Sequence, residues 1–214
     1  MTFIINEKSN YFEDILSESP IERLFLQEII KYLEIGTEID QQIEYDTKIG
    51  KFRVDFLIRK DQIEYVVELD GKDFHKPEID IWRDAFLLGE NKFKSMIRIK
   101  GKDITHSLNE CLYFLSRVFP ETFSQRGKAN LSTLIEFENK RAIDENLEEN
   151  MFKSIDTFYL PKVEFEDEEK KSYPSIEINY KNQSDFKNWK NYYGFAIEER
   201  IYNIPELNKR YFKM

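Results

Sequence analysis

Apolar residues recur along the chain with two different spacings. Between residues 18 and 34 they fall at intervals of three and four, the spacing of one face of an α-helix. These positions are Ile21, Leu24, Phe25, Ile29, Tyr32 and Leu33. Ser19, Pro20 and Glu22 form the sequence of a capping box with proline at the first helical position. The pattern therefore predicts a helix that begins at Pro20.

Three β-type segments follow this helix. They cover residues 41–45, 51–59 and 63–71, and the short connections between them have the composition of hairpin turns. Strands joined by such tight turns pair antiparallel. We therefore expect a three-strand antiparallel meander after the first helix.

The next elements alternate between helix and strand. The spacing of apolar residues predicts a second helix over residues 77–93, a short strand over 95–104 and a third helix over 107–119. Because a helix separates the new strand from the meander, a crossover connection can place it parallel to a neighbour. The expected fold of residues 1–119 is thus an α/β domain.

The pattern is weaker beyond Pro120. A helix is expected over residues 131–153, a strand over 175–180 and an aromatic helix over 184–200. We interpret residues 120–214 as a smaller α+β C-terminal extension. The aromatic residues of its last helix are expected to pack against the first domain, with base stacking as the alternative. They are Phe186, Trp189, Tyr192, Tyr193 and Phe195.

Composition limits the kinds of site that the chain can build. Its 214 residues include one cysteine, Cys111, and two histidines, which excludes an internal disulfide and a Cys/His zinc cluster. The net charge of −9 argues against coating nucleic acid by bulk electrostatics, although a local basic strip is compatible with it. No apolar stretch approaches the roughly 20 residues that span a bilayer. We therefore expect a cytoplasmic protein that does not contact a membrane.

Charged residues alternate with apolar ones in the segment VVELDGKDFH, residues 66–75. Glu68, Asp70 and Lys72 would stand on one face of a strand, where the two carboxylates repel each other. Asp55 lies in the middle of an apolar strand, which is costly unless the carboxylate is paired or binds a cation. If the hairpin pairs as expected, three carboxylates converge from adjacent strands. Such an oxygen cage suits Mg²⁺, which supports phosphodiester hydrolysis.

The same residues carry a family resemblance. Asp55, followed after fourteen residues by Asp70-Gly71-Lys72, resembles the D…(D/E)-x-K signature of the PD-(D/E)XK nuclease superfamily. The wider pattern of VDFLI, VVELDGKDFH, DIWRDAFLLG and IRIKGKDI resembles small restriction-endonuclease-like proteins related to very-short-patch mismatch repair endonucleases. The similarity covers roughly residues 19–119. It implies a restriction-endonuclease-like core and a metal-dependent endonuclease that hydrolyses DNA phosphodiester bonds in restriction, repair or phage defence.

The resemblance also implies roles for single residues. Asp55, Glu68 and Asp70 would bind Mg²⁺, for which Mn²⁺ is expected to substitute. Two registers remain open: Asp70-x-Lys72 is the catalytic pair, with Lys72 assisting the nucleophile, or Glu68-x-Asp70 fills those places and Lys72 is peripheral. Glu22 corresponds to a helical glutamate that completes the active site in many members. Its structural interpretation as a capping-box residue is equally good.

Further residues are candidates for nucleic-acid contact. His75 stands slightly farther from Asp70-Gly71 than the histidine of the family pattern. A basic strip is expected to contact phosphates or, alternatively, to form a solvated strand edge. It comprises Arg98, Lys100 and Lys102, which alternate along the expected strand, with Lys92 and Lys94. Arg83 and Asp84 are interpreted as ion-pair residues rather than substrate contacts.

Two rival functions remain at this stage. The first is a catalytically silent nuclease-fold module that binds nucleic acid or a protein partner. The second is a structural interaction protein whose acidic face docks a basic partner. A homodimer, or a partner protein bound through the C-terminal extension, is compatible with cleavage of both DNA strands, because two strands often require two active sites.

Overall fold

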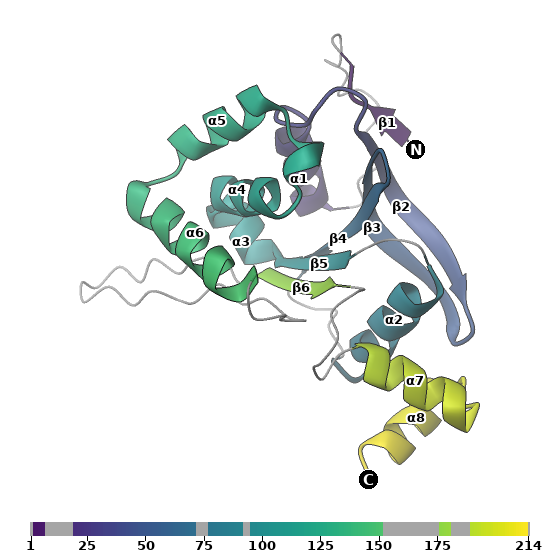
Figure 1. Ribbon diagram of the computed structural model, residues 1–214. Helices are drawn as coiled ribbons and strands as arrows, with labels where there is room; N and C mark the ends of the chain where they lie inside the picture. The colour runs from purple at the N-terminus through teal and green to yellow at the C-terminus, as the bar shows by residue number, and fades with distance from the viewer. Residues whose placement is uncertain are drawn as a thin grey trace.

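The computed structural model describes residues 2–6, 19–71, 77–91, 95–151, 176–180 and 189–213. Within these residues, six strands form one mixed sheet in the order β1-β2-β3-β4-β5-β6 (Figure 1). Strands β1 to β4 pair antiparallel, β5 runs parallel to β4, and β6 pairs antiparallel with β5. Their bounds are Thr2–Ile4, Glu38–Thr47, Gly50–Lys60, Ile63–Asp70, Ser95–Lys100 and Ile176–Tyr180.

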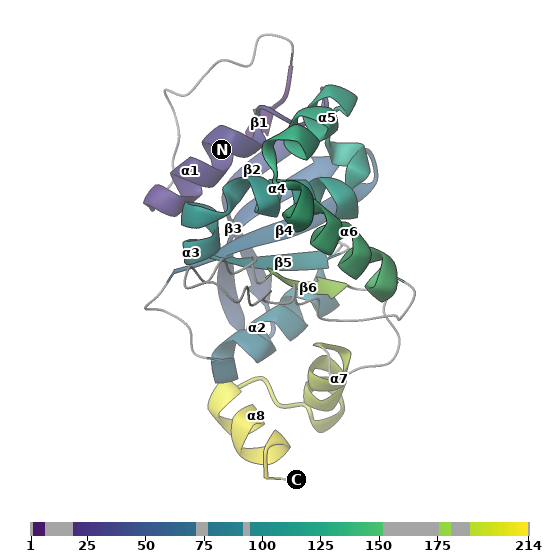
Figure 2. The same cartoon turned by 90° about the vertical axis from the view of Figure 1, so that its left-hand side faces the viewer.

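Helices cover both faces of this sheet. Helices α1, α3, α4, α5 and α6 lie on one face, whereas α2 lies on the other face with α7 and α8 outside it (Figures 1 and 2). The helices from α1 to α8 are Pro20–Ile29, Pro77–Glu90, Gly101–His106, Leu108–Val118, Gln125–Leu134, Phe137–Met151, Trp189–Glu199 and Ile204–Tyr211, and a 3₁₀ turn spans Pro120–Thr122. In the described part of the chain, no helix combines the length and the apolar composition needed to cross a membrane.

The alternation of side chains along the central strands divides the core into two layers. In β4, Tyr65 and Val67 point into the larger core beneath α1 and α4, whereas Val66 points into the core beneath α2. Tyr65 is fully buried, and its hydroxyl lies 3.0 Å from the hydroxyl of Thr122. A third cluster packs Trp82 and Phe86 of α2 against α7 and α8. Helix α2 therefore has one side on the sheet and one side on the C-terminal helices.

Strands β3 and β4 separate at Asp55. Their ladder runs from Lys60↔Ile63 to Phe56↔Val67 and does not continue beyond that pair. The first half of β3 instead continues with β2 as a hairpin that reaches past α2 (Figure 1). Val54 packs in the core beneath α2, but Phe56, two residues later, packs in the core beneath α1. Since a regular strand keeps such residues on one face, β3 changes face at Asp55.

Most elements predicted from the sequence are confirmed. The first helix begins at Pro20, the three strands form an antiparallel meander, and β5 lies parallel to β4 after the crossover through α2. Residues 176–180 form the expected strand, as β6. Residues 184–188 of the expected aromatic helix lie outside the described residues, and α7 covers 189–199.

Two predicted elements have wrong boundaries. The strand expected over residues 95–104 ends at Lys100, and α3 begins at Gly101, because Lys100 pairs with Asp70 and the partner strand ends there. The helix expected over 131–153 is two helices, α5 and α6, separated at Ile135. Ile135 is extended and buried, so the chain turns there to place an apolar side chain in the core.

The C-terminal half of the chain shares its core with the N-terminal half. Leu131 of α5 and Ile143 of α6 lie in the core beneath α1, and β6 extends the sheet beside β5. Tyr192 and Tyr193 of α7 pack on α2, in agreement with the packing role expected for this aromatic helix. The predicted boundary between residues 119 and 120 thus separates two segments that share one core and one sheet.

Glycine 127 gives a test of this shared packing. A Cβ atom at Gly127 would lie 2.1 Å from the backbone oxygen of Tyr32, which has little room to move because it also accepts a hydrogen bond from the Ser124 backbone N–H at 3.0 Å. Gly127→Ala is therefore expected to lower the free energy of unfolding by about 1–3 kcal/mol, as overpacking does. Gly194→Ala, in open space within α7, is the control and is expected to be neutral or stabilising by up to about 1 kcal/mol. Urea unfolding of both variants measures this, and equal changes would contradict the close packing at Gly127.

Candidate functional site

Asp55 occupies the point where β3 leaves β4. One of its carboxylate oxygens, Oδ2, accepts a hydrogen bond of 2.8 Å from the backbone N–H of Leu69. That N–H has no ladder partner on β3, because the pairing stops at Val67. Burial raises the pKa of Asp55, the hydrogen bond from Leu69 opposes this rise, and the nearby carboxylate of Glu22 adds to it. We call the point where β3 and β4 separate the fork. Asp55 stabilises the fork through its bond to Leu69 and also places a partly desolvated carboxylate there.

Glu68 is buried next to this fork, with only 5% of its surface exposed. Its Oε1 accepts a hydrogen bond of 2.5 Å from Nη2 of Arg83, and Arg83 also donates to the backbone oxygen of Arg53 at 3.0 Å. Burial raises the pKa of Glu68 to about 7, although the guanidinium groups of Arg83 and Arg98 act in the opposite direction. Glu68 thus exchanges its proton near neutral pH.

Arg98 connects the end of β4 to α2. It is the neighbour of Glu68 across the parallel ladder and is itself buried. Its Nη1 donates to Oδ1 of Asp70 at 3.0 Å, and its Nε and Nη2 donate to the two oxygens of Asp84 at 2.9 and 2.5 Å. Burial lowers the pKa of Arg98, but the carboxylates of Asp84, Glu68 and Asp70 together more than offset this effect and hold the pKa well above its usual value. Arg98 is therefore a permanent cation inside the site.

Together these residues form an acid cluster at the end of β4. It consists of Asp55, Glu68, Asp70 and Asp84 with Arg83 and Arg98. Four carboxylates face two guanidinium groups, an excess of two negative charges when all groups are ionised. Buried like charges of this kind favour the uptake of a proton or a cation. The pKa values of Asp55 and Glu68 are raised first by burial and further by the neighbouring carboxylates.

Glu22 approaches the acid cluster from α1. Ser19 caps α1 as predicted, because the backbone N–H of Glu22 donates to Oγ of Ser19 at 3.3 Å, and that hydroxyl in turn donates to Oε1 of Glu22 at 2.8 Å. Its other oxygen accepts a hydrogen bond of 2.8 Å from Nε2 of Gln42. Since Glu22 also acts electrostatically on Asp55, its capping role and its proximity to the site are both present.

Sequence reasoning missed Gln42. This residue has a left-handed backbone conformation with φ of 53° and stands in β2 opposite Asp55, where the ladder is interrupted between Gln41↔Phe56 and Ile43↔Val54. Non-glycine residues with positive φ are uncommon and often occur at functional sites. The signal available in the sequence was the polar pair Gln41-Gln42, which breaks the alternation of the strand.

The acid cluster includes Arg83 and Asp84, which we interpret from the sequence as ion-pair residues rather than substrate contacts. Arg83 and Asp84 are ion-pair residues as predicted, but each pairs with the sheet rather than with an adjacent residue of its helix: Arg83 with Glu68, and Asp84 with Arg98. Consecutive residues of a helix point in different directions, so they do not pair with each other. Arg83 reaches β4 and Asp84 reaches β5. Arg98 was expected to lie in a phosphate-binding strip and is instead buried in ion pairs.

The predicted basic strip is not continuous along one strand. Lys100 is exposed at the end of β5, and Lys102 is exposed on α3, so Arg98, Lys100 and Lys102 do not alternate along one strand face. The expectation of one strand carrying all three is wrong because the sheet ends at Lys100. Lys72, His75, Lys92 and Lys94 lie outside the described residues.

The carboxylates of the acid cluster match Mg²⁺ in kind and in charge. All their donor atoms are oxygen, and the excess negative charge favours a cation. Among the described residues, however, no three His, Cys, Asp or Glu side chains come together in an arrangement that could hold a metal ion. In this structure the guanidinium groups of Arg83 and Arg98 supply the positive charge next to Glu68 and Asp70.

Comparison of the chain with protein-family models, with curated proteins and with solved structures found no significant match.

The pKa of Glu68 predicts a pH-dependent effect of Glu68→Gln. Because burial raises this pKa to about 7 from its ordinary value of 4.5, the folded protein holds the proton more tightly than the unfolded chain. Stability from this group is present at low pH and is lost as the pH rises to about 7. The free energy of unfolding of Glu68→Gln minus that of wild type is therefore expected to increase by on the order of 2–3 kcal/mol from pH 5 to pH 8. Urea unfolding at both pH values measures this, and a pH-independent difference would contradict the raised pKa.

Proposed function

We propose that the protein is a divalent-metal-dependent endonuclease that hydrolyses DNA phosphodiester bonds. The observation that carries this proposal is the acid cluster, in which Asp55, Glu68 and Asp70 gather from two strands at the fork with an excess of negative charge. The order of elements supports it: a helix, an antiparallel meander, a crossover helix and a parallel strand are the parts of a restriction-endonuclease-like core. Restriction, repair and phage defence are the processes that such an enzyme would serve.

In this proposal Asp55, Glu68 and Asp70 hold Mg²⁺ or Mn²⁺. When bound, the ion would polarise a phosphodiester and lower the pKa of a water molecule. Burial raises the pKa of Glu68 to about 7, so a cation that binds this carboxylate near neutral pH would displace a proton from it. Arg83 can bind a phosphate oxygen once it leaves Glu68, because a guanidinium binds phosphate and carboxylate in the same manner.

Two residues have roles that depend on the register of the motif. Lys72 assists the nucleophile if Asp70-x-Lys72 is the catalytic pair and is peripheral if Glu68-x-Asp70 is. Glu22 acts next to Asp55 in either register, held by Gln42 and Ser19.

A second candidate is a catalytically silent nuclease-fold module that binds nucleic acid or a protein partner. The observation that favours it is that Arg83 and Arg98 already bind Glu68 and Asp70. Buried ion pairs of this kind also occur where the role is purely structural. Cleavage assays separate the two candidates, because only the nuclease loses an activity when the acids are changed.

Incubation of plasmid and single-stranded DNA with Mg²⁺ or Mn²⁺ tests the proposal. Wild type is expected to cleave DNA, and Asp55→Asn and Asp70→Asn are expected to lose at least about 100-fold in rate, because each removes a charge from the acid cluster while retaining an oxygen acceptor. Asp46→Asn is the matched control, since Asp46 is exposed on the β2–β3 hairpin and is paired there with Lys51 at 3.6 Å.

The same assay defines the results that would overturn the proposal. Absence of metal-dependent cleavage on any nucleic acid would favour the silent module. Equal rates for wild type, Asp55→Asn and Asp70→Asn would place any observed cleavage outside the acid cluster.

A further inference from the structure

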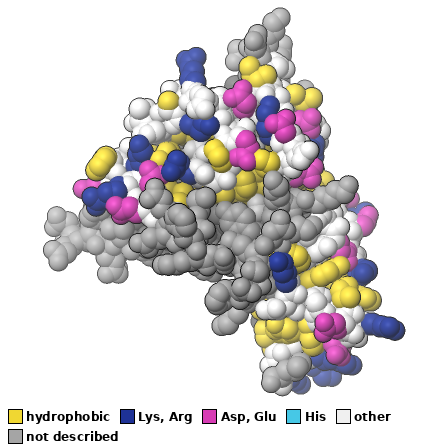
Figure 3. All heavy atoms as spheres, viewed as in Figure 1, with side chains coloured by type: hydrophobic (Ala, Val, Ile, Leu, Met, Phe, Trp, Pro, Cys, Tyr) yellow, Lys and Arg dark blue, Asp and Glu magenta, His cyan; other side chains and the backbone are white. Residues whose placement is uncertain are grey.

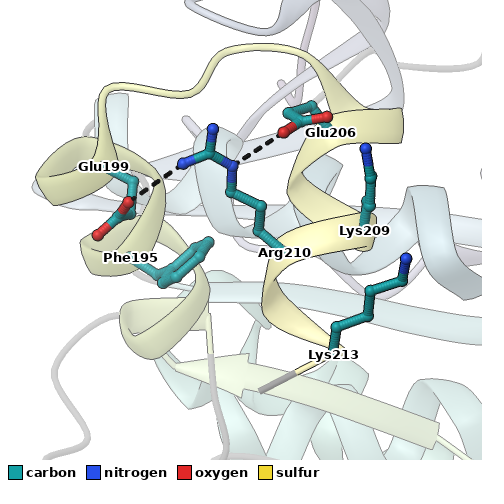
Figure 4. A pocket seen from close by; sticks show the side chains of 6 residues that line it. All are labelled: Phe195, Glu199, Glu206, Lys209, Arg210 and Lys213. Atoms are coloured by element: carbon teal, nitrogen blue, oxygen red, sulfur yellow. Dashed lines mark hydrogen bonds and ion pairs between the residues drawn. The ribbon is translucent and has the colours of Figure 1, made fainter.

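A pocket of about 520 Å³ lies between α7 and α8, on the side of α2 that faces away from the sheet (Figure 4). It is lined by Phe195, Glu199, Glu206, Lys209, Arg210 and Lys213. Figure 3 shows Lys and Arg side chains gathered at this lower end of the molecule, over α8. The pocket therefore joins an aromatic wall to a set of cations.

Arg210 is the structural cation of this pocket. Its Nε donates to Oε1 of Glu206 at 2.8 Å, and its Nη1 lies 3.6 Å from Oε2 of Glu199 (Figure 4). The side chain thus ties α8 to α7, and two carboxylates compensate its charge. Arg210 is already engaged within the protein.

Lys209 and Lys213 are in a different situation. Both are exposed. They act electrostatically on the carboxylate of Glu206, but neither forms an ion pair within 4.0 Å among the described residues. Lys209 lies in the last turn of α8, and Lys213 directly follows Phe212, the C-cap residue of that helix. Figure 4 shows them side by side at the rim of the pocket. Two ammonium groups so placed can contact phosphates that follow one another along a strand.

The C-terminal helical segment has a net charge opposite in sign to that of the whole chain. Residues 189–213 contain five Lys and Arg and three Glu, whereas the whole chain carries a net charge of −9. The acid cluster repels phosphate in the absence of a cation, so affinity for a polyanion requires a separate basic surface. The α7–α8 pocket provides one.

An exposed aromatic ring accompanies the two lysines. Phe212, between Tyr211 and Lys213, is 54% exposed, and its ring centroid lies 5.4 Å from that of the partly buried Tyr211. An exposed phenylalanine beside lysines is suited to stacking on a base or a sugar. The ring of Phe195 forms part of the pocket wall.

The basic surface is held to the same helix as the acid cluster. Trp82 of α2 donates from Nε1 to Oδ1 of Asn208 at 2.6 Å, and Leu207 is fully buried against it. Trp82 immediately precedes Arg83 and Asp84, which belong to the acid cluster. Helix α2 therefore contributes side chains to the acid cluster and also holds α8 in place.

We infer that the α7–α8 pocket binds the phosphodiester backbone of DNA, with Lys209 and Lys213 on phosphates and Phe212 on a sugar or base. The inference rests on the proposed function only for the choice of DNA as the polyanion. It adds to that function a binding surface outside the site of cleavage.

Fluorescence anisotropy of a labelled DNA duplex and of a labelled single strand tests the inference, using the full chain in EDTA so that no cleavage occurs. Lys209→Glu/Lys213→Glu is expected to weaken binding roughly 10-fold or more at low salt. It is also expected to reduce the slope of log K against log[salt] by about 1 for each lysine. Arg126→Glu/Arg141→Glu, on α5 and α6, changes the net charge equally and is expected to bind as wild type.

The outcomes separate this inference from the proposed function. If wild type binds DNA and the α8 variant binds equally well, or if wild type binds no DNA, the inference is wrong. If both charge variants lose the same affinity, a nonspecific effect of net charge replaces it. Binding that depends on Lys209 and Lys213 without cleavage by wild type would support the pocket and contradict the nuclease. Unchanged cleavage and unchanged affinity in Lys209→Glu/Lys213→Glu would support the nuclease and contradict the pocket.

Discussion

The separation of β3 from β4 at Asp55 is the constraint on which the site depends. The two strands share a ladder that ends at the pair Phe56↔Val67. The backbone N–H of Leu69 lies past this end, and the carboxylate of Asp55 accepts its hydrogen bond in place of a strand partner. A buried backbone donor without a partner costs about 1–3 kcal/mol, so the carboxylate stabilises an opening in the sheet. The same opening gives Glu68 and Asp70 side-chain neighbours other than β3.

Helix α2 contributes charged side chains to this opening, where Arg83 contacts both β3 and β4. Arg83 binds Glu68, Asp84 binds Arg98, and Arg98 reaches Asp70, so the helix and β5 hold the acids through charged hydrogen bonds. Two guanidinium groups do not neutralise four carboxylates. Burial raises the pKa values of Asp55 and Glu68, and the neighbouring carboxylates add to this rise. Burial of that excess charge is what distinguishes the cluster from an ordinary surface ion-pair network.

Much of this arrangement could be predicted from the sequence, because helices and strands bury residues with characteristic spacings. The alternation around Glu68 and the isolated Asp55 indicated the acids, but the register of β4 against β5 was not encoded locally, so the burial of Arg98 was unexpected. Strand β1 is too short to give a pattern, and α8 is fixed by a distant contact between Trp82 and Asn208.

We propose that the acid cluster binds a divalent cation because of its excess negative charge. Isothermal titration calorimetry of the full chain with Mn²⁺ at pH 8 and pH 6 tests it most directly. Binding is expected at pH 8, weaker binding is expected at pH 6 because Glu68 takes up a proton, and Asp55→Asn is expected to lose binding. Absence of binding by wild type, or equal binding by wild type and Asp55→Asn, would contradict it.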